Sequence, residues 1–204
     1  MSEKKVRIGF VGVGNMGQAA HLRNYAMMPE CEVVALAEVK PELARKVAAR
    51  WGVPKVYASH EEMLAREDLD GLVAAQPFTR HGTLIPELLR HGKPVLTEKP
   101  IAGSVAQGEK IVEAMEAAHT WMMIGYHKRS DPATMLAKAE IDGLKVSGEL
   151  GRMTYVRILM PAGDWIANGF NQNVSSDEPA PESAWDPPTS TATAVRTLSR
   201  VVSG

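Results

Sequence analysis

The sequence is poor in cysteine and has no excess of either charge. Its 204 residues include a single cysteine, Cys31, so no internal disulfide can form and a reducing compartment fits the chain. Because Cys31 begins an apolar run, we interpret it as a small core residue rather than a reactive thiol. The formal net charge is -1, and lysine and arginine are scattered along the chain. These features give no support to a nucleic-acid-binding role.

Long hydrophobic runs are also lacking. The N-terminus passes from polar residues 2–5 into an apolar run of strand length, too short for a signal sequence or a membrane span. We therefore expect a soluble cytoplasmic protein without a membrane partner. A hydrophobic content of 45% can support one full core and part of a second.

The most informative pattern lies where the β-branched run over residues 6–11 meets a G-x-G-x-x-G turn. A strand leading through this turn into a helix is the fingerprint of a dinucleotide-binding βαβ unit. The first glycine turns the chain out of the strand, the second lets the backbone approach a pyrophosphate, and the third lets the helix pack on the sheet. The predicted cofactor-binding residues of this turn are Gly12, Val13, Gly14, Asn15, Met16 and Gly17. The alternative is a tight strand-to-helix turn in another doubly wound fold.

An acidic residue, Glu38, ends the next apolar run, about twenty residues after the glycines. A carboxylate there can accept a hydrogen bond from a ribose 2′-OH but would repel a 2′-phosphate. The sequence therefore favours NAD over NADP as cofactor. Lys40 opposes this preference, since a cation two residues away can partly offset the repulsion. In a different doubly wound fold, Glu38 would be a solvated carboxylate.

Helical and strand patterns alternate through the first 125 residues. We expect strands over 6–11, 31–38, 55–57, 70–77, 94–98 and 120–125, and helices over 16–27, 41–51, 60–66, 79–90 and 104–118. Such alternation predicts an α/β fold with a doubly wound parallel sheet covered on both faces.

Two loops at predicted carboxyl ends of strands carry further signals, because ligands bind at that edge of an open α/β sheet. Ala75-Gln76-Pro77 is followed by a spaced histidine, His81, and the next strand ends in Glu98-Lys99-Pro100. Residues 125–132 then read G-Y-x-x-R with a following D-P. In this order the motifs resemble the glucose-fructose oxidoreductase, inositol dehydrogenase and rhizopine catabolism (Gfo/Idh/MocA) family. The resemblance runs from Val6 to about Trp165 and includes a helix over 132–146, a turn over 147–151 and a strand over 153–160.

The resemblance implies an NAD- or NADP-dependent Rossmann-type oxidoreductase acting on a carbinol or aldehyde of a sugar or cyclitol. Lys99 would be the catalytic residue, placed beside the nicotinamide and holding the substrate oxygen. Glu98 would orient Lys99 or contact a cofactor ribose. Gln76, Pro77 and His81 would line the cofactor cleft. Taken without their neighbours, Lys99 is a surface lysine and His81 a partly exposed structural histidine.

By the same resemblance, Tyr126 and Arg129 would reach the substrate. A salt bridge at the domain boundary is an equally good interpretation of Arg129. The remaining histidines share no metal-ligand spacing, so we predict no metal site; these are His21, His60, His91 and His119.

The chain departs from the family pattern after the strand expected over 153–160. Family members carry a second sheet that supplies a D-x-x-x-H motif, whereas no histidine follows His127 here. From Asn171 the composition becomes polar and rich in proline, serine and threonine. We therefore expect a cofactor domain over 1–125, the start of an incomplete α+β second domain over 126–170, and a flexible tail over 171–204. A shortened gene product, for example one with a frameshifted end, would explain this; a tail that orders against a partner subunit is the alternative.

Two functional hypotheses follow. The first is an oxidoreductase that acts on a small sugar or cyclitol, with weak or no activity in this form. Such an enzyme could assemble as a homo-oligomer. The second is a non-catalytic NAD-binding or sensing module.

Overall fold

Six short apolar runs form one sheet. The computed structural model of the chain describes residues 4–159 and 169–179. The strands are β1 (Val6–Val11), β2 (Cys31–Ala37), β3 (Lys55–Tyr57), β4 (Gly71–Ala74), β5 (Val95–Thr97) and β6 (Met122–Ile124). Within the described residues, the strands and the helices between them belong to a first unit, made of residues up to 125 together with 170–179.

All strands pair in parallel, in the order β3-β2-β1-β4-β5-β6. The chain builds outward from β1 to β3 and then crosses back to place β4 on the other side of β1. The position between β1 and β4 is therefore a topological switch point, where the connections from neighbouring strands leave in opposite directions. The glycine turn follows β1 directly and so lies at this point. The predicted doubly wound parallel sheet is confirmed.

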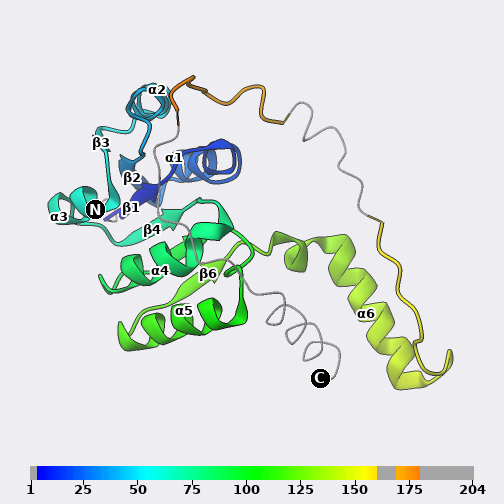
Figure 1. The fold of residues 1–204 in the computed structure, drawn as a ribbon. Coiled ribbons are helices and arrows are strands. Elements are labelled where there is room, and N and C mark those ends of the chain that lie inside the picture. Colours follow the sequence, from blue (N-terminus) through cyan, green and yellow to red (C-terminus); the bar gives the residue numbers. More distant parts are fainter. Residues whose placement is uncertain (1–3, 160–168, 180–204) are drawn as a thin grey trace. The chain divides into compact units, whose positions relative to one another are not determined.

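Helices cover both faces of the sheet. On one face lie η1 (Gly17–Leu22), α1 (Arg23–Met27) and α2 (Pro41–Trp51), which pack with Ile8, Phe10 and Val73. On the other lie α3 (His60–Arg66), α4 (His81–Leu89) and α5 (Val105–Ala117), which pack with Val11 and Leu72. Figure 1 shows α4 and α5 lying side by side. Alternate residues of the strands thus serve opposite faces, as expected for a sheet buried on both sides.

Local sequence signals explain where the helices begin and end. Ser59 and Ser104 accept hydrogen bonds from the backbone amides of Glu62 and Gln107, at 3.2 and 3.3 Å, and so cap α3 and α5. The α2 helix begins at Pro41 and is closed by a glycine at position 52 with φ +69°. These boundaries agree with the sequence expectations.

Cys31 is buried, with 8% of its surface exposed, and its thiol donates to the carbonyl of Tyr25 at 3.3 Å. Burial raises the pKa of this thiol, and the nearby charge of Glu30 raises it further. The interpretation of Cys31 as a core residue is confirmed.

Three expectations need correction. In the helix expected over 16–27, residues 17–22 form a π-helix, η1, and the α-helix α1 begins at Arg23. A short 3-10 helix, η2 (Phe78–Arg80), likewise precedes α4 in the helix expected over 79–90. The strand expected over 153–160 is wrong for residues 153–159, which form no strand. An extended segment needs a neighbouring strand to satisfy its backbone groups, and the described part of the chain pairs none with it.

The second unit comprises residues 126–169, described up to 159 and at 169. It contains a 3-10 turn, η3 (His127–Ser130), and the long helix α6 (Pro132–Ser147). Asp131 caps α6 by accepting from the amide of Ala133 at 3.0 Å, and Gly148 closes the helix with φ +68°. No residue of α6 is buried.

The segment expected as a flexible tail over 171–204 is described only as far as Pro179, and residues 180–204 lie outside the described part. Residues 170–179 belong to the first unit and hydrogen-bond to its residues. None of the described helices is both long and apolar enough to cross a bilayer.

The burial of Ile85 in the core can be tested by its contribution to stability. Ile85 of α4 is fully buried in the cluster beneath α4 and α5, so the change Ile85→Ala should lower the free energy of unfolding by about 2–5 kcal/mol. Val112 of α5 is 38% exposed, and Val112→Ala should cost far less. Chemical denaturation measures both; equal losses would contradict the assigned core.

Candidate functional site

The glycine turn after β1 is closely packed against neighbouring backbone. Gly12 has φ +89°, and its amide donates to the carbonyl of Ala37 at 2.8 Å. A Cβ added to Gly12 would lie 2.1 Å from Nε2 of Gln76, and one added to Gly17 would lie 2.8 Å from the carbonyl oxygen of Gly12. Only glycine therefore fits at these two positions.

Gly14 differs from both, because a Cβ built there meets no atom within 4 Å. The space beside its backbone is open. The turn thus presents the arrangement that a dinucleotide needs, with two glycines enclosed by the fold and the middle one facing free space. The residues present fit a pyrophosphate at this position.

Glu38 lies at the end of β2 and is 9% exposed. Its Oε2 accepts from the amide of Val13 at 2.9 Å, and its Oε1 accepts from the amide of Lys40 at 3.1 Å. These bonds fix the carboxylate between the glycine turn and the start of α2. Each carboxylate oxygen can accept a second hydrogen bond, so Glu38 keeps acceptor capacity for a ribose hydroxyl.

A cleft of about 460 Å³ lies at this edge of the sheet. Five of the predicted cofactor residues line it: Gly12, Gly14, Glu38, Gln76 and Pro77. Among the other lining residues are Lys40, Leu43, Ser59, Glu61 and Arg80, which come from the ends of β2, β3 and β4 and from the helices that follow them. Val13, Asn15, Met16, Gly17, His81, Glu98 and Lys99 are not among the lining residues.

His81 is fully buried rather than placed on the cleft surface. Its Nδ1 lies 2.9 Å from the carbonyl oxygen of Pro100, and its Nε2 lies 3.2 Å from that of Gln76. The ring therefore bridges the loop after β4 and the loop after β5. In this arrangement His81 positions both loops.

The loop after β5 holds Glu98 and Lys99. The Lys99 side chain is exposed, its amide faces Oε2 of Glu98 at 3.3 Å, and the Lys99–Pro100 peptide is cis. Oε1 of Glu98 lies 2.8 Å from Nε2 of His21, and each of these two side chains is 14% exposed. Since His21 lies in η1, the pair connects the helix after the glycine turn with the loop that carries Lys99.

Two further residues of this region, His21 and Arg80, were not among the predicted site residues. From the sequence, His21 was considered only as a metal ligand; its place four residues after Gly17 was the signal that it faces the strand ends. Arg80 lines the cleft, donates to Oε1 of Gln76 at 3.1 Å, and has a buried Nε without a hydrogen-bond partner in the described structure. Its position in the loop after β4 was the available signal.

Glu61 also lines the cleft, and the positive charge of Arg80 helps to lower its pKa. Burial raises the pKa of Glu61, but hydrogen bonds from its own backbone amide and from Ser59, together with the charges of His60 and Arg80, outweigh burial and lower it. Glu61 is therefore charged at neutral pH, and the cleft holds groups of both signs.

Tyr126 and Arg129 belong to the second unit, where both side chains are exposed. The guanidinium of Arg129 lies over the Tyr126 ring, 5.8 Å from its centroid. In the described part of the chain Arg129 forms no ion pair.

One cluster in the described residues has the composition of a metal site. His60, Glu61 and Glu87 offer ligand atoms within 4.8 Å of one another. The two ring nitrogens of His60 face different carboxylates, at 3.3 and 3.4 Å, and the glutamate side chains are 69% and 50% exposed. This geometry suits a surface charge network better than a shared ion.

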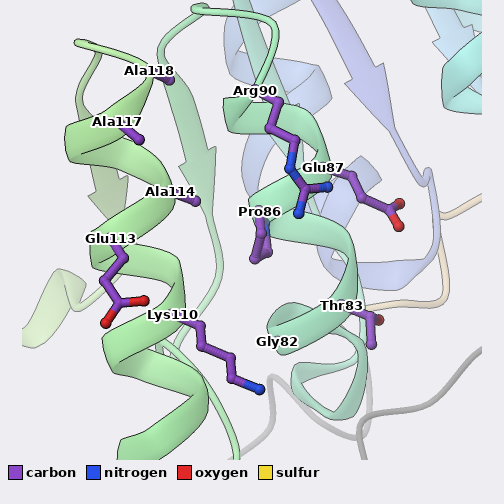
Figure 2. A pocket seen from close by; sticks show the side chains of 10 residues that line it. All are labelled: Gly82, Thr83, Pro86, Glu87, Arg90, Lys110, Glu113, Ala114, Ala117 and Ala118. Atoms are coloured by element: carbon purple, nitrogen blue, oxygen red, sulfur yellow. The ribbon is translucent and has the colours of Figure 1, made fainter.

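A second hollow, of about 640 Å³, runs between α4 and α5. Figure 2 shows Pro86 and Ala114 between charged side chains such as Arg90 and Lys110, which extend from the two helices. The groove shares no lining residue with the cleft at the glycine turn. It is therefore separate from the candidate cofactor site.

Comparison with known proteins finds a matching family model and similar dehydrogenases. Residues 6–126 match the family model GFO_IDH_MocA, described as an oxidoreductase family with an NAD-binding Rossmann fold. An inositol 2-dehydrogenase of Acidothermus cellulolyticus is 32% identical over 142 residues, which are 69% of this chain and 41% of that protein. One from Rubrobacter xylanophilus is 31% identical over 150 residues, covering 72% of this chain and 42% of that protein.

Solved structures of dehydrogenases also match the chain. Scyllo-inositol dehydrogenase from Lactobacillus casei, solved with NAD(H) and scyllo-inositol, matches with a TM-score of 0.64 and 26% identity, over 70% of this chain and 42% of that chain. The WlbA dehydrogenase from Bordetella pertussis, in complex with NADH and UDP-GlcNAcA, matches with a TM-score of 0.65 and 27% identity, over 74% and 42%. The chain thus spans less than half the length of the relatives it matches.

The open space beside Gly14 generates a binding test. Gly14→Leu should abolish NAD binding measured by calorimetry, because the side chain would fill the space that the pyrophosphate needs. The fold should persist, since the added Cβ meets no protein atom.

Gly143 of α6 is the matched control, because its Cβ would also meet nothing within 4 Å. Gly143→Leu should leave NAD binding unchanged. Undiminished NAD binding by Gly14→Leu would show that the pyrophosphate does not lie at the glycine turn.

Proposed function

Because this chain belongs to the Gfo/Idh/MocA oxidoreductase family, we propose that it binds NAD in preference to NADP and provides the cofactor half of a sugar or cyclitol dehydrogenase. The observation that carries the proposal is the cleft at the switch point, where an open glycine backbone and a fixed carboxylate lie together.

The residues at this edge of the sheet would contact the two halves of the dinucleotide separately. Glu38 would accept from the adenosine ribose, and the turn over residues 12–17 would receive the pyrophosphate. The nicotinamide half would then extend across the switch point toward the ends of β4 and β5. Gln76 and Pro77 lie on that path, and the loop of Glu98 and Lys99 follows it.

When bound, NAD would supply the acceptor for a hydride from the carbinol carbon of the substrate. The ammonium of Lys99 would hold the substrate oxygen and stabilise the negative charge that develops on it. Glu98 would fix the Lys99 backbone through its contact with the amide and would itself be fixed by His21.

The substrate class rests on the relatives. Two of them are named inositol 2-dehydrogenases, and one similar structure holds scyllo-inositol. Polyhydroxylated rings need several hydrogen-bonding side chains, and Tyr126 and Arg129 are the proposed contributors from the second unit. We infer a cytoplasmic setting and propose that the protein can form a homo-oligomer.

Activity of the 204-residue chain alone should be weak. It spans 41% and 42% of the two inositol dehydrogenases above, and no histidine follows His127 to serve as a further proton-transfer group. Lys99 is exposed, so water weakens its interaction with a substrate oxygen.

A non-catalytic NAD-binding or sensing module is the second candidate. It is favoured by the contrast between a well-formed cofactor cleft and the exposed Lys99.

The proposal predicts a defined result for Lys99→Ala. NAD binding should be retained, since Lys99 does not line the cleft, while any oxidation of a sugar or cyclitol panel should fall about a hundredfold or more. NADH formation measures turnover, and Lys93→Ala controls for loss of a lysine elsewhere in the first unit.

Turnover unchanged in Lys99→Ala would remove Lys99 from the mechanism. Robust turnover by the unmodified chain would instead show that the 204 residues form a working dehydrogenase. NAD binding without turnover by the unmodified chain would favour the second candidate.

A further inference from the structure

Residues 170–179, here called the strap, lie along the face of the first unit that carries η1 and α2 (Figure 1). The strap begins at the glycine turn, where the side-chain amide of Asn173 donates to the carbonyl of Asn15 at 3.1 Å. The amide of Val174 donates to Oε1 of Gln18, and Nε2 of Gln18 donates back to the Val174 carbonyl, both at 2.9 Å. The Val174 side chain packs on the core of this face.

The other end of the strap reaches the start of α2. Oε2 of Glu178 accepts from the amides of Glu42 and Leu43 at 2.9 and 3.1 Å, and Oε1 accepts from Glu42 at 3.1 Å. The hydroxyl of Ser176 donates to the same carboxylate at 2.8 Å. Glu178 therefore occupies the free amide groups at the beginning of an 11-residue helix.

These amides lie beside the proposed ribose position. Only Val39 and Lys40 separate Glu38 from the first residue of α2, and Leu43 lines the same cleft as Glu38. A phosphate on the ribose 2′ oxygen would extend from Glu38 toward α2, whose first amides are the donors that phosphates use at helix starts. In this chain those donors already hold a carboxylate.

We propose that Glu178 is a specificity-determining residue, which occupies the start of α2 and so excludes the 2′-phosphate of NADP while admitting NAD. The proposal rests on the proposed function, because it assigns the cleft to a dinucleotide. It places one determinant of cofactor choice on a segment about 140 residues beyond the βαβ unit that binds the cofactor.

Charge supports this role. Burial raises the pKa of Glu178, but the bonds from Ser176, Glu42 and Leu43 and the charge of Arg45 outweigh it, so the pKa is lowered. The carboxylate is therefore ionised at neutral pH. Lys40 and Arg80 also line the cleft and would attract a 2′-phosphate, against the carboxylates of Glu38 and Glu61. Glu178 adds a further carboxylate at the start of α2, on the amides of Glu42 and Leu43.

The test compares NAD⁺ and NADP⁺ binding by calorimetry to the full 204-residue chain and to Glu178→Gln. The change keeps the size of the side chain and removes its charge. NADP⁺ affinity should rise about tenfold, as expected for removing one charge near a phosphate in a solvent-exposed setting, while NAD⁺ affinity stays within twofold.

Asp177→Asn is the matched control, because Asp177 is the exposed neighbouring carboxylate. It should leave both affinities unchanged. Raising the salt concentration should change the ratio of NAD⁺ to NADP⁺ affinity less in Glu178→Gln than in the unmodified chain, because one charge fewer acts on the 2′-phosphate.

The binding results distinguish failure of the Glu178 proposal from failure of the proposed function. A gain in NADP⁺ affinity confined to Glu178→Gln supports the proposal. Unchanged NADP⁺ affinity in Glu178→Gln, or an equal gain in Asp177→Asn, overturns the role proposed for Glu178. The proposed NAD-binding function would still stand. If the unmodified chain binds neither dinucleotide, the proposed function fails and the role of Glu178 fails with it.

Discussion

The close packing around Gly12 is the constraint on which the rest of the site depends. Three separate elements meet its backbone: β2 through the Ala37 carbonyl, η1 through Gly17, and the loop after β4 through Gln76. Gln76 leaves no room for a Cβ at Gly12, and the Gly12 carbonyl leaves none at Gly17. The turn is thereby held in one conformation at the switch point, with the backbone of Gly14 facing open space. A site of this kind is preorganised, because folding has already ordered the groups that would meet a ligand.

The parallel sheet then gathers side chains that are far apart in the sequence. Because the carboxyl ends of parallel strands meet at one edge, Glu38 after β2, Gln76 after β4 and Lys99 after β5 share that edge. Two contacts fix the loops there: the buried His81 ring lies between the carbonyls of two adjacent loops, and the partly buried His21 pairs with Glu98. Function is thus divided between residues that face the cleft and residues that hold those in place. The strap adds residues from a segment far along the chain, which bond to η1 and to the start of α2.

Much of this was predictable from local signals. Glycine spacing, helix caps such as Ser104 and the acid at position 38 each act over a few residues, so the sequence shows them directly. The roles of His81 and His21 were not predictable, because they depend on which carbonyl or carboxylate the fold brings within reach. The strand expected over 153–160 failed for residues 153–159 since a strand requires a partner that local sequence does not reveal. Polar composition in residues 171–179 likewise gave no hint that Glu178 would bond to the start of α2.

The central claim is that a dinucleotide binds at the switch point, and amide-resolved NMR of the isotope-labelled chain tests it most directly. On addition of NAD⁺, the largest shifts should fall on the amides of Gly12, Val13 and Gly14, with further shifts around Glu38 and Gln76 and little change along α6. Shifts confined to the groove between α4 and α5, or no shifts at saturating NAD⁺, would contradict the account.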